Sequence, residues 1–206
     1  MTTGKTHGYE EVMAPNVYFD RTFNIDAAKI LPGEFYATMR DMVLVTVLGS
    51  CVAACIRDKV TGIGGMNHFM LPDNSGEQSG WGIGGRYGSY AMEMLINQLQ
   101  KLGAERKNLE AKVFGGGNVI AQMTATNVGE RNAQFVLNYL KTEKIHVASK
   151  DLLDIYPRKV YYFPNSGKVL VKKLRKLHNS TIEQREQEYV SRLQTSKVEG
   201  DIELFT

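Results

Sequence analysis

The segment LGSCVAACIRDKVTGIGGMNHFMLP, residues 48–72, contains both cysteines of the chain and one of its four histidines. A cysteine thiolate becomes a nucleophile when a base or a depressed pKa activates it. It also needs backbone N–H donors for the oxyanion that forms on an acyl carbon. Gly49 and Ser50 precede Cys51 and allow a tight turn that presents such amides. His68, which follows after one turn, is the base that this pattern offers.

The same residues also have an ordinary structural interpretation. Cysteine is among the residue types most often buried, so Cys51 and His68 could simply belong to a core. Cys55 lies in an apolar run without a glycine before it, and we expect it to pack. On one strand, the two cysteine Cα atoms would be about 13 Å apart, too far for a disulfide. Free thiols and a cytoplasmic location follow.

Metal and nucleotide chemistry find little support elsewhere. His146 and His178 have no acidic or cysteine neighbours at ligand spacing, so no metal site is predicted. The segments FGGGN and WGIGGRYG are rich in glycine, but neither matches a phosphate-binding loop. We therefore expect no metal and no cofactor.

The whole chain has 206 residues, of which 43% are hydrophobic and 23% charged, as in one globular domain. A net charge of +3 is too mild to indicate a nucleic-acid partner. The lysines of residues 168–178 are typical of a guarded edge strand. No apolar run approaches the about 18 residues of a membrane span, and the first residues lack the apolar centre of a signal peptide. The protein is thus not expected to be embedded in a membrane.

Hydrophobic patterning predicts the elements that must hold these side chains. Alternating or continuous apolar runs predict strands at 33–39, 42–48, 51–56, 63–71, 109–115 and 146–152, and a hairpin over 159–174. An i, i+4, i+7 stripe predicts helices at 86–103 and 129–145, and residues 72–85 are expected to form a loop. The fold class is therefore mixed α/β.

We expect three regions along the chain. Residues 1–29 mix prolines and isolated aromatic residues without a period and are expected to form an arm. Residues 30–177 form the domain. Residues 178–206 are a polar tail in which a helix could begin near Ser180 or Thr181.

Six segments, in order and spacing, resemble the CheD family of chemoreceptor glutamine deamidases. They are LGSCVAACIRD, GIGGMNHFMLP, RYGSYAMEMLI, LEAKVFGGGN, GERNAQFVLNYL and YPRKVYYFPNSGKVLVKKL. The resemblance implies a layered sandwich of mixed β-strands flanked by two main helices, like the fold of the cytotoxic necrotising factor deamidases. It implies hydrolysis of selected glutamine side chains in methyl-accepting chemoreceptors, through a cysteine thioester, to glutamate and ammonia.

The family's nucleophile falls on Cys51 and its base on His68. A threonine shortly before the cysteine completes the family's triad, and Thr46 is the candidate because its neighbours Val45 and Val47 carry no hydroxyl. Gly49 and Ser50 are expected to help to bind the substrate and its oxyanion. The resemblance implies no metal and no cofactor.

The resemblance also implies two partners, the cytoplasmic domain of chemoreceptors and, in organisms that have it, the phosphatase CheC. A regulatory binding protein in which catalysis is secondary is therefore the alternative function. A papain-like protease is a weaker alternative, since the domain is small and no asparagine or aspartate partner lies at the distances that this class uses.

Overall fold

The computed structural model describes residues 12–14, 16–71, 82–119, 128–174 and 180–195. The strands that lead to the site are β1 (Val12–Met13), β2 (Asn16–Asp20), β3 (Ile25–Lys29), β4 (Glu34–Thr38), β5 (Val43–Leu48), β6 (Val52–Asp58) and β7 (Gly64–His68). The remaining strands are β8 (Leu109–Gly115), β9 (His146–Leu152), β10 (Arg158–Phe163) and β11 (Lys168–Lys173). The helices are α1 (Gly82–Lys101), α2 (Val128–Thr142) and α3 (Ser180–Thr195), with a short 3-10 turn, η1 (Arg106–Asn108).

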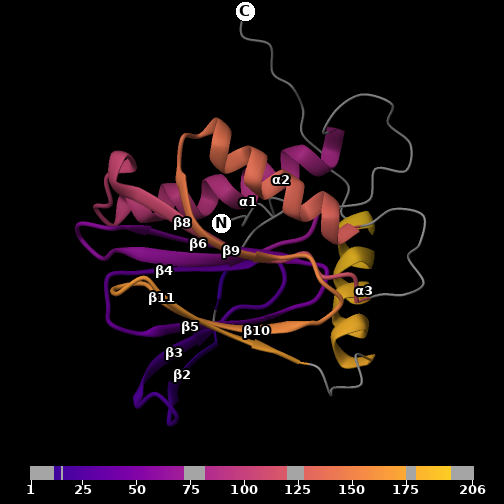
Figure 1. The fold of residues 1–206 in the computed structure, drawn as a ribbon, viewed down its shortest axis with the longest axis horizontal. Helices are drawn as coiled ribbons and strands as arrows, with labels where there is room; N and C mark the ends of the chain where they lie inside the picture. The colour runs from indigo at the N-terminus through magenta and orange to yellow at the C-terminus, as the bar shows by residue number, and fades with distance from the viewer. Residues whose placement is uncertain (1–11, 15, 72–81, 120–127, 175–179, 196–206) are drawn as a thin grey trace, which may run out of the picture.

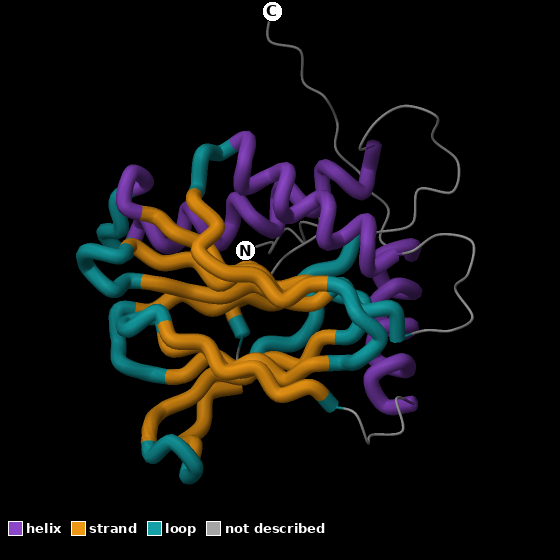
Figure 2. Tube along the Cα trace, viewed as in Figure 1, coloured by secondary structure: helices purple, strands orange, loops and turns teal. Residues whose placement is uncertain are grey.

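The strands form two sheets that lie face to face. One has six strands in the order β1-β4-β7-β6-β8-β9, and the other has five in the order β11-β10-β5-β3-β2. Helices α1 and α2 cover the outer face of the six-stranded sheet, and α3, in yellow, stands across one end of both sheets (Figure 1). The same layering of helices over strands is visible in Figure 2. The mixed α/β layered architecture predicted from the sequence is confirmed.

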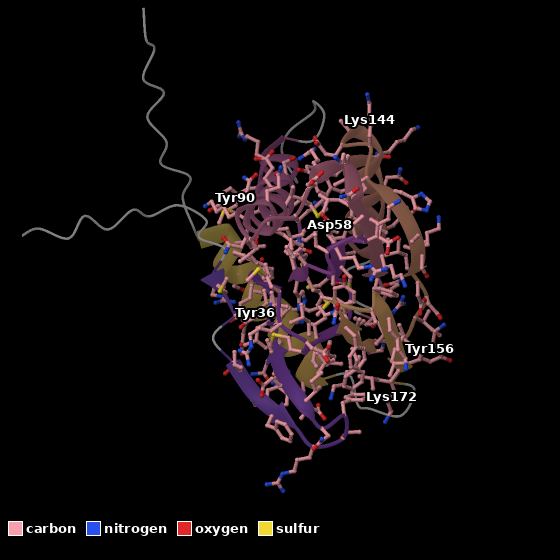
Figure 3. All side chains as sticks on the ribbon, turned by 90° about the vertical axis from the view of Figure 1, so that its left-hand side faces the viewer. Tyr36, Asp58, Tyr90, Lys144, Tyr156 and Lys172 are labelled. Carbon is pink, nitrogen blue, oxygen red and sulfur yellow. The ribbon has the colours of Figure 1, made fainter. Side chains whose placement is uncertain are left out.

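Three labelled residues mark the positions of the layers in the side view. Figure 3 shows Tyr90 and Lys144 on the helical layer and Lys172 on the opposite side, in the five-stranded sheet. Helix α1 buries the predicted stripe, which includes Tyr87, Ala91, Leu95 and Leu99. The strands and both helices predicted for the domain are present, although α1 begins at Gly82, inside the predicted loop. Residues 72–81 of that loop lie outside the described residues.

The structure differs from the expectation of an arm before residue 30. Strands β2 and β3 form a hairpin, and β3 pairs in parallel with β5. Ala27 and Ala28 are fully buried. Because β3 is flanked on both sides by strands and carries small side chains, it lacks the alternation that announces a half-buried strand. The boundaries 30–177 for the domain stay a prediction.

Within the part of the chain that the structure describes, no helix combines the length and the apolar content that a bilayer crossing demands.

Candidate active site

Thr46 lies in the middle of β5, and strand alternation decides which way it points. Leu44 and Leu48 belong to the main core between the sheets, whereas Val43 and Val45 belong to a second cluster on the outer face. Side chains two residues apart share a face of a strand, so Thr46 points into the space between the sheets. It is buried there, with 1% of its surface exposed. A hydroxyl in such a place must find partners.

Thr46 finds those partners in His68 and Ile30. Its hydroxyl donates to the Ile30 carbonyl at 2.7 Å, and its Oγ1 lies 2.8 Å from His68 Nδ1. A hydroxyl has one hydrogen to donate, so with that hydrogen on Ile30 it accepts from Nδ1–H. This fixes the tautomer: the proton is on Nδ1, and the lone pair is on Nε2.

Nε2 of His68 is buried and has no hydrogen-bond partner among the described residues. Burial lowers the pKa of His68 to about 4, although the backbone carbonyl of Ile30 acts in the opposite direction. The imidazole is therefore neutral at physiological pH. A neutral imidazole with a fixed tautomer and an unpartnered lone pair has the properties that a general base needs.

The strand register brings Cys51 to the same face as His68. Val52 and Phe69 exchange both backbone hydrogen bonds, at 2.9 and 3.0 Å. Cys51 precedes Val52, and His68 precedes Phe69, so the two residues are diagonal neighbours on an antiparallel pair. Such neighbours have Cα atoms about 7–8 Å apart. The long imidazole of His68 can span that separation to a thiol.

The loop of residues 49–51 joins β5 of one sheet to β6 of the other. Each of its three backbone carbonyl groups accepts a hydrogen bond. Gly117 N–H donates to the Gly49 carbonyl at 2.7 Å, and Gly116 N–H donates to the Cys51 carbonyl at 2.8 Å. The Ser50 carbonyl accepts from Asn132 Nδ2 at 2.9 Å. Because a peptide unit is planar, fixing a carbonyl also fixes the direction of the following N–H.

The N–H groups of the same loop converge on one carboxylate. Gly49 N–H and Cys51 N–H donate to Glu186 Oε1 at 3.0 and 3.1 Å. Ser50 donates to Glu186 Oε2 from its N–H at 3.0 Å and from its hydroxyl at 2.6 Å. Two of these backbone amides point at one carboxylate oxygen and the third at the other, and converging donors of this kind are what an oxyanion needs. We call this group of donors the amide nest.

Gly49 lets the carboxylate approach the nest. A Cβ built on Gly49 would lie 2.7 Å from Glu186 Oε1 and 2.7 Å from Val119 Cγ2. No side chain fits at this position while the nest is occupied. Glycine at 49 is therefore required by close approach, whereas the sequence suggested a tight turn.

The two cysteines are both buried but differ in their surroundings. Cys51 lies at the nest, where burial, followed by the charge of Glu186, raises its pKa well above the usual value. Cys55 is buried inside β6, where burial raises its pKa and the only other contribution is from Lys112. Both thiols are free. With their pKa values shifted in these directions, the Cys51 thiol is protonated and the His68 imidazole is neutral at physiological pH.

Sequence reasoning missed four residues of this arrangement: Gly116, Gly117, Asn132 and Glu186. The glycines were noticed, but only as a failed phosphate loop. Asn132 carried a signal, since it is a polar residue on the apolar stripe of α2, four positions before Val136. Glu186 carried a similar signal in the polar tail.

A cavity of about 340 Å³ opens beside the histidine and under α3. Its wall includes Thr46, His68, Ile182 and Glu186, and three cations, Lys29, Lys159 and Arg185, also line it. Among the described residues, no three His, Cys, Asp or Glu side chains stand close enough together to hold a metal ion.

A cysteine, a histidine of fixed tautomer and converging backbone amides, set between two sheets, are the groups that thiol-dependent acyl transfer requires. A family model described as CheD chemotactic sensory transduction matches residues 70–173. This chain belongs to the CheD family.

Curated relatives cover nearly the whole chain, including the site. A probable chemoreceptor glutamine deamidase CheD of Janthinobacterium sp. (strain Marseille) is 65% identical over 96% of this chain and 98% of the relative. One of Herminiimonas arsenicoxydans has the same identity and coverage. A probable chemoreceptor glutamine deamidase CheD 1 of Dechloromonas aromatica (strain RCB) is 64% identical over 97% of this chain and 98% of the relative.

Proposed function

We propose that this chain is a protein-glutamine deamidase that hydrolyses glutamine side chains of methyl-accepting chemoreceptors to glutamate and ammonia. The observation that carries the proposal is the convergence of three backbone amides beside Cys51, with the free Nε2 of His68 on the same face. The names of the relatives supply the substrate class.

The first half of the reaction forms a thioester. His68 Nε2 takes the thiol proton, and Cys51 Sγ attacks the glutamine Cδ. The oxyanion accepts hydrogen bonds from the N–H groups of Gly49 and Cys51, which already point at one oxygen in the structure. His68 then gives its proton to the leaving nitrogen, and ammonia departs.

The second half restores the enzyme. His68 Nε2 removes a proton from water, which attacks the thioester carbon, and the same amides hold the second oxyanion. The C–S bond breaks, glutamate leaves, and the proton returns to Cys51. Thr46 takes no proton in these steps; it positions the imidazole through Nδ1.

A receptor cytoplasmic fragment, incubated with and without the protein, tests this function. We expect selected glutamines to gain the mass of an amide-to-acid conversion, with release of an equal amount of ammonia. A fragment that stays unmodified while it binds the protein would favour the alternative, a regulatory partner of receptors or of CheC. The burial of Cys51, His68 and Thr46 is the observation that keeps this alternative in view.

Two finer elements belong to the same proposal. CheC is the second partner, and the protein acts in the cytoplasm, where free thiols such as Cys51 persist. Co-purification with CheC from a strain that encodes it tests the first element, and cell fractionation tests the second.

A further inference from the structure

The buried side chains that the structure describes on helix α3 form one stripe, and one member of that stripe is charged. The stripe repeats at helical spacing, so it faces the body of the protein. Its members are Ile182, Glu186, Tyr189 and Leu193, exposed by 6%, 2%, 4% and 5%. Three of the four are apolar contacts of an ordinary docked helix. Burying Glu186 among them would be costly unless hydrogen bonds satisfied its carboxylate.

The amide nest supplies those hydrogen bonds. All four groups that meet the Glu186 carboxylate are donors, three backbone N–H groups and the Ser50 hydroxyl. A carboxylate offers acceptors on both oxygens, whereas a carboxamide offers an acceptor on one side and a donor on the other. The nest as it stands therefore matches a carboxylate better than an amide, because the N–H of Ser50 would face the NH₂ group of an amide.

The group that sits in the nest is the group that the proposed reaction makes. Glutamate is the product of glutamine hydrolysis, and Glu186 presents a glutamate side chain to the donors proposed to hold the oxyanion. On the basis of the proposed function, we infer that α3 is a built-in product mimic. Its Glu186 occupies the position of the target residue, and the site is closed to protein substrates until α3 leaves.

Burial of the reacting groups supports the closed state. Cys51 has no exposed surface, and Thr46 and His68 are exposed by only 1% and 2%. A receptor glutamine must bring its Cδ to the Cys51 sulfur, and Glu186 stands where its side chain has to enter. Besides the hydrogen bonds to Glu186, α3 is held through Tyr189, whose hydroxyl hydrogen-bonds that of Tyr87 and whose ring lies against Gly33.

The first test measures access to Cys51 and needs no catalysis. Alkylation by iodoacetamide is followed by mass spectrometry in the unsubstituted protein, in Glu186→Ala and in Glu188→Ala. Glu188 is exposed on the same helix and accepts a hydrogen bond from Gln184 Nε2, so it is the matched control. Cys55, buried in β6, reports whether the fold stays closed elsewhere.

Cys51 should be alkylated about ten- to a hundredfold faster in Glu186→Ala than in the unsubstituted protein, as expected for losing hydrogen bonds to a charged group. The alkylation rate of Cys51 in Glu188→Ala should equal that of the unsubstituted protein, and Cys55 should stay unmodified in all three proteins. Equal rates at Cys51 in the three proteins would overturn the inference.

The second test asks whether position 186 is the position of a substrate. In Glu186→Gln, the helix carries an amide where the product group stood. Cys51 should convert it: water is consumed, the C–N bond breaks, a C–O bond forms and ammonia leaves. Cleavage after lysine releases residues 177–197 as one fragment, and fragmentation separates position 186 from Gln184 and Gln187. Both of these are exposed and serve as internal controls.

We expect conversion at position 186 alone, at a rate that does not change with protein concentration, and none in Glu186→Gln combined with Cys51→Ala. If Glu186→Gln deamidates a receptor fragment but keeps its own amide, α3 does not hold the substrate position and the inference fails. If no variant deamidates a receptor fragment or itself, the proposed function fails instead, while the alkylation rates still decide whether α3 closes the site.

Discussion

Thr46 and His68 belong to different sheets, yet Thr46 Oγ1 lies 2.8 Å from His68 Nδ1. The hydrogen bond crosses the space between the sheets, where no water is needed to complete it. It joins the packing of the sandwich to the orientation of the imidazole. A change in how the two sheets pack would therefore change the orientation of the His68 imidazole.

Removing the Thr46 hydroxyl should slow the reaction without weakening substrate binding. Thr46→Val keeps the shape but leaves His68 Nδ1–H without this acceptor, so kcat should fall about ten- to a hundredfold while KM stays the same. Thr46→Ser restores the oxygen and should recover most of the rate. Steady-state ammonia release from a receptor fragment measures both constants. A Thr46→Ser enzyme as slow as Thr46→Val would contradict a positioning role.

Substitution of each cysteine by alanine should have a different effect on activity. Cys51→Ala should abolish deamidation of a receptor fragment, with an unchanged circular dichroism spectrum. Cys55→Ala should keep the activity and lose a modest amount of stability, because it removes one buried sulfur from β6. The opposite pattern, full activity in Cys51→Ala and none in Cys55→Ala, would show that the nucleophile is misassigned.

Burial of His68 should make the fold less stable in mild acid. Its pKa falls from 6.5 to about 4 on folding, so between these values the unfolded chain binds a proton that the folded chain does not. The stabilisation is complete above pH 6.5 and is lost as the pH falls towards 4, by at most about 3 kcal/mol. Urea unfolding at pH 7 and pH 5 measures the loss. The loss should shrink in His68→Gln, and an equal loss in both proteins would assign it to other groups.

Asn132 should matter for both stability and rate. It donates to the Ser50 carbonyl and accepts from Leu71 N–H, each at 2.9 Å, and it is fully buried. Asn132→Ala should cost about 1–3 kcal/mol of unfolding free energy and lower kcat, since the peptide that aims an N–H into the nest loses its support. Asn138→Ala, an exposed position on the same helix, is the control and should be neutral. Unchanged kcat in a destabilised Asn132→Ala would limit this residue to packing.

Short-range patterns predicted most of the fold. The continuous apolar run of β5, the alternation in β10 and the apolar stripes of α1 and α2 follow from local patterns, and the structure confirms them. The hairpin of β2 and β3 was missed because Ala27 and Ala28 gain their burial from strands distant in sequence. No local pattern records that pairing.

The site was predictable in part for a similar reason. Cys51 and His68 stand in one short segment, and their register follows from the turn between two strands. Glu186 lies 135 residues beyond Cys51, in a helix whose exposed faces are strongly polar. A carboxylate within an apolar stripe was the available signal, but only the folded chain shows which donors it meets.

Attachment of Glu186 to the chain sets how strongly it competes. A tethered ligand is present at an effective concentration that does not depend on the amount of enzyme. Dilution or dialysis therefore leaves it bound. A receptor has to outcompete a neighbour that never diffuses away, so a higher local concentration of target side chains is needed to reach the same activity.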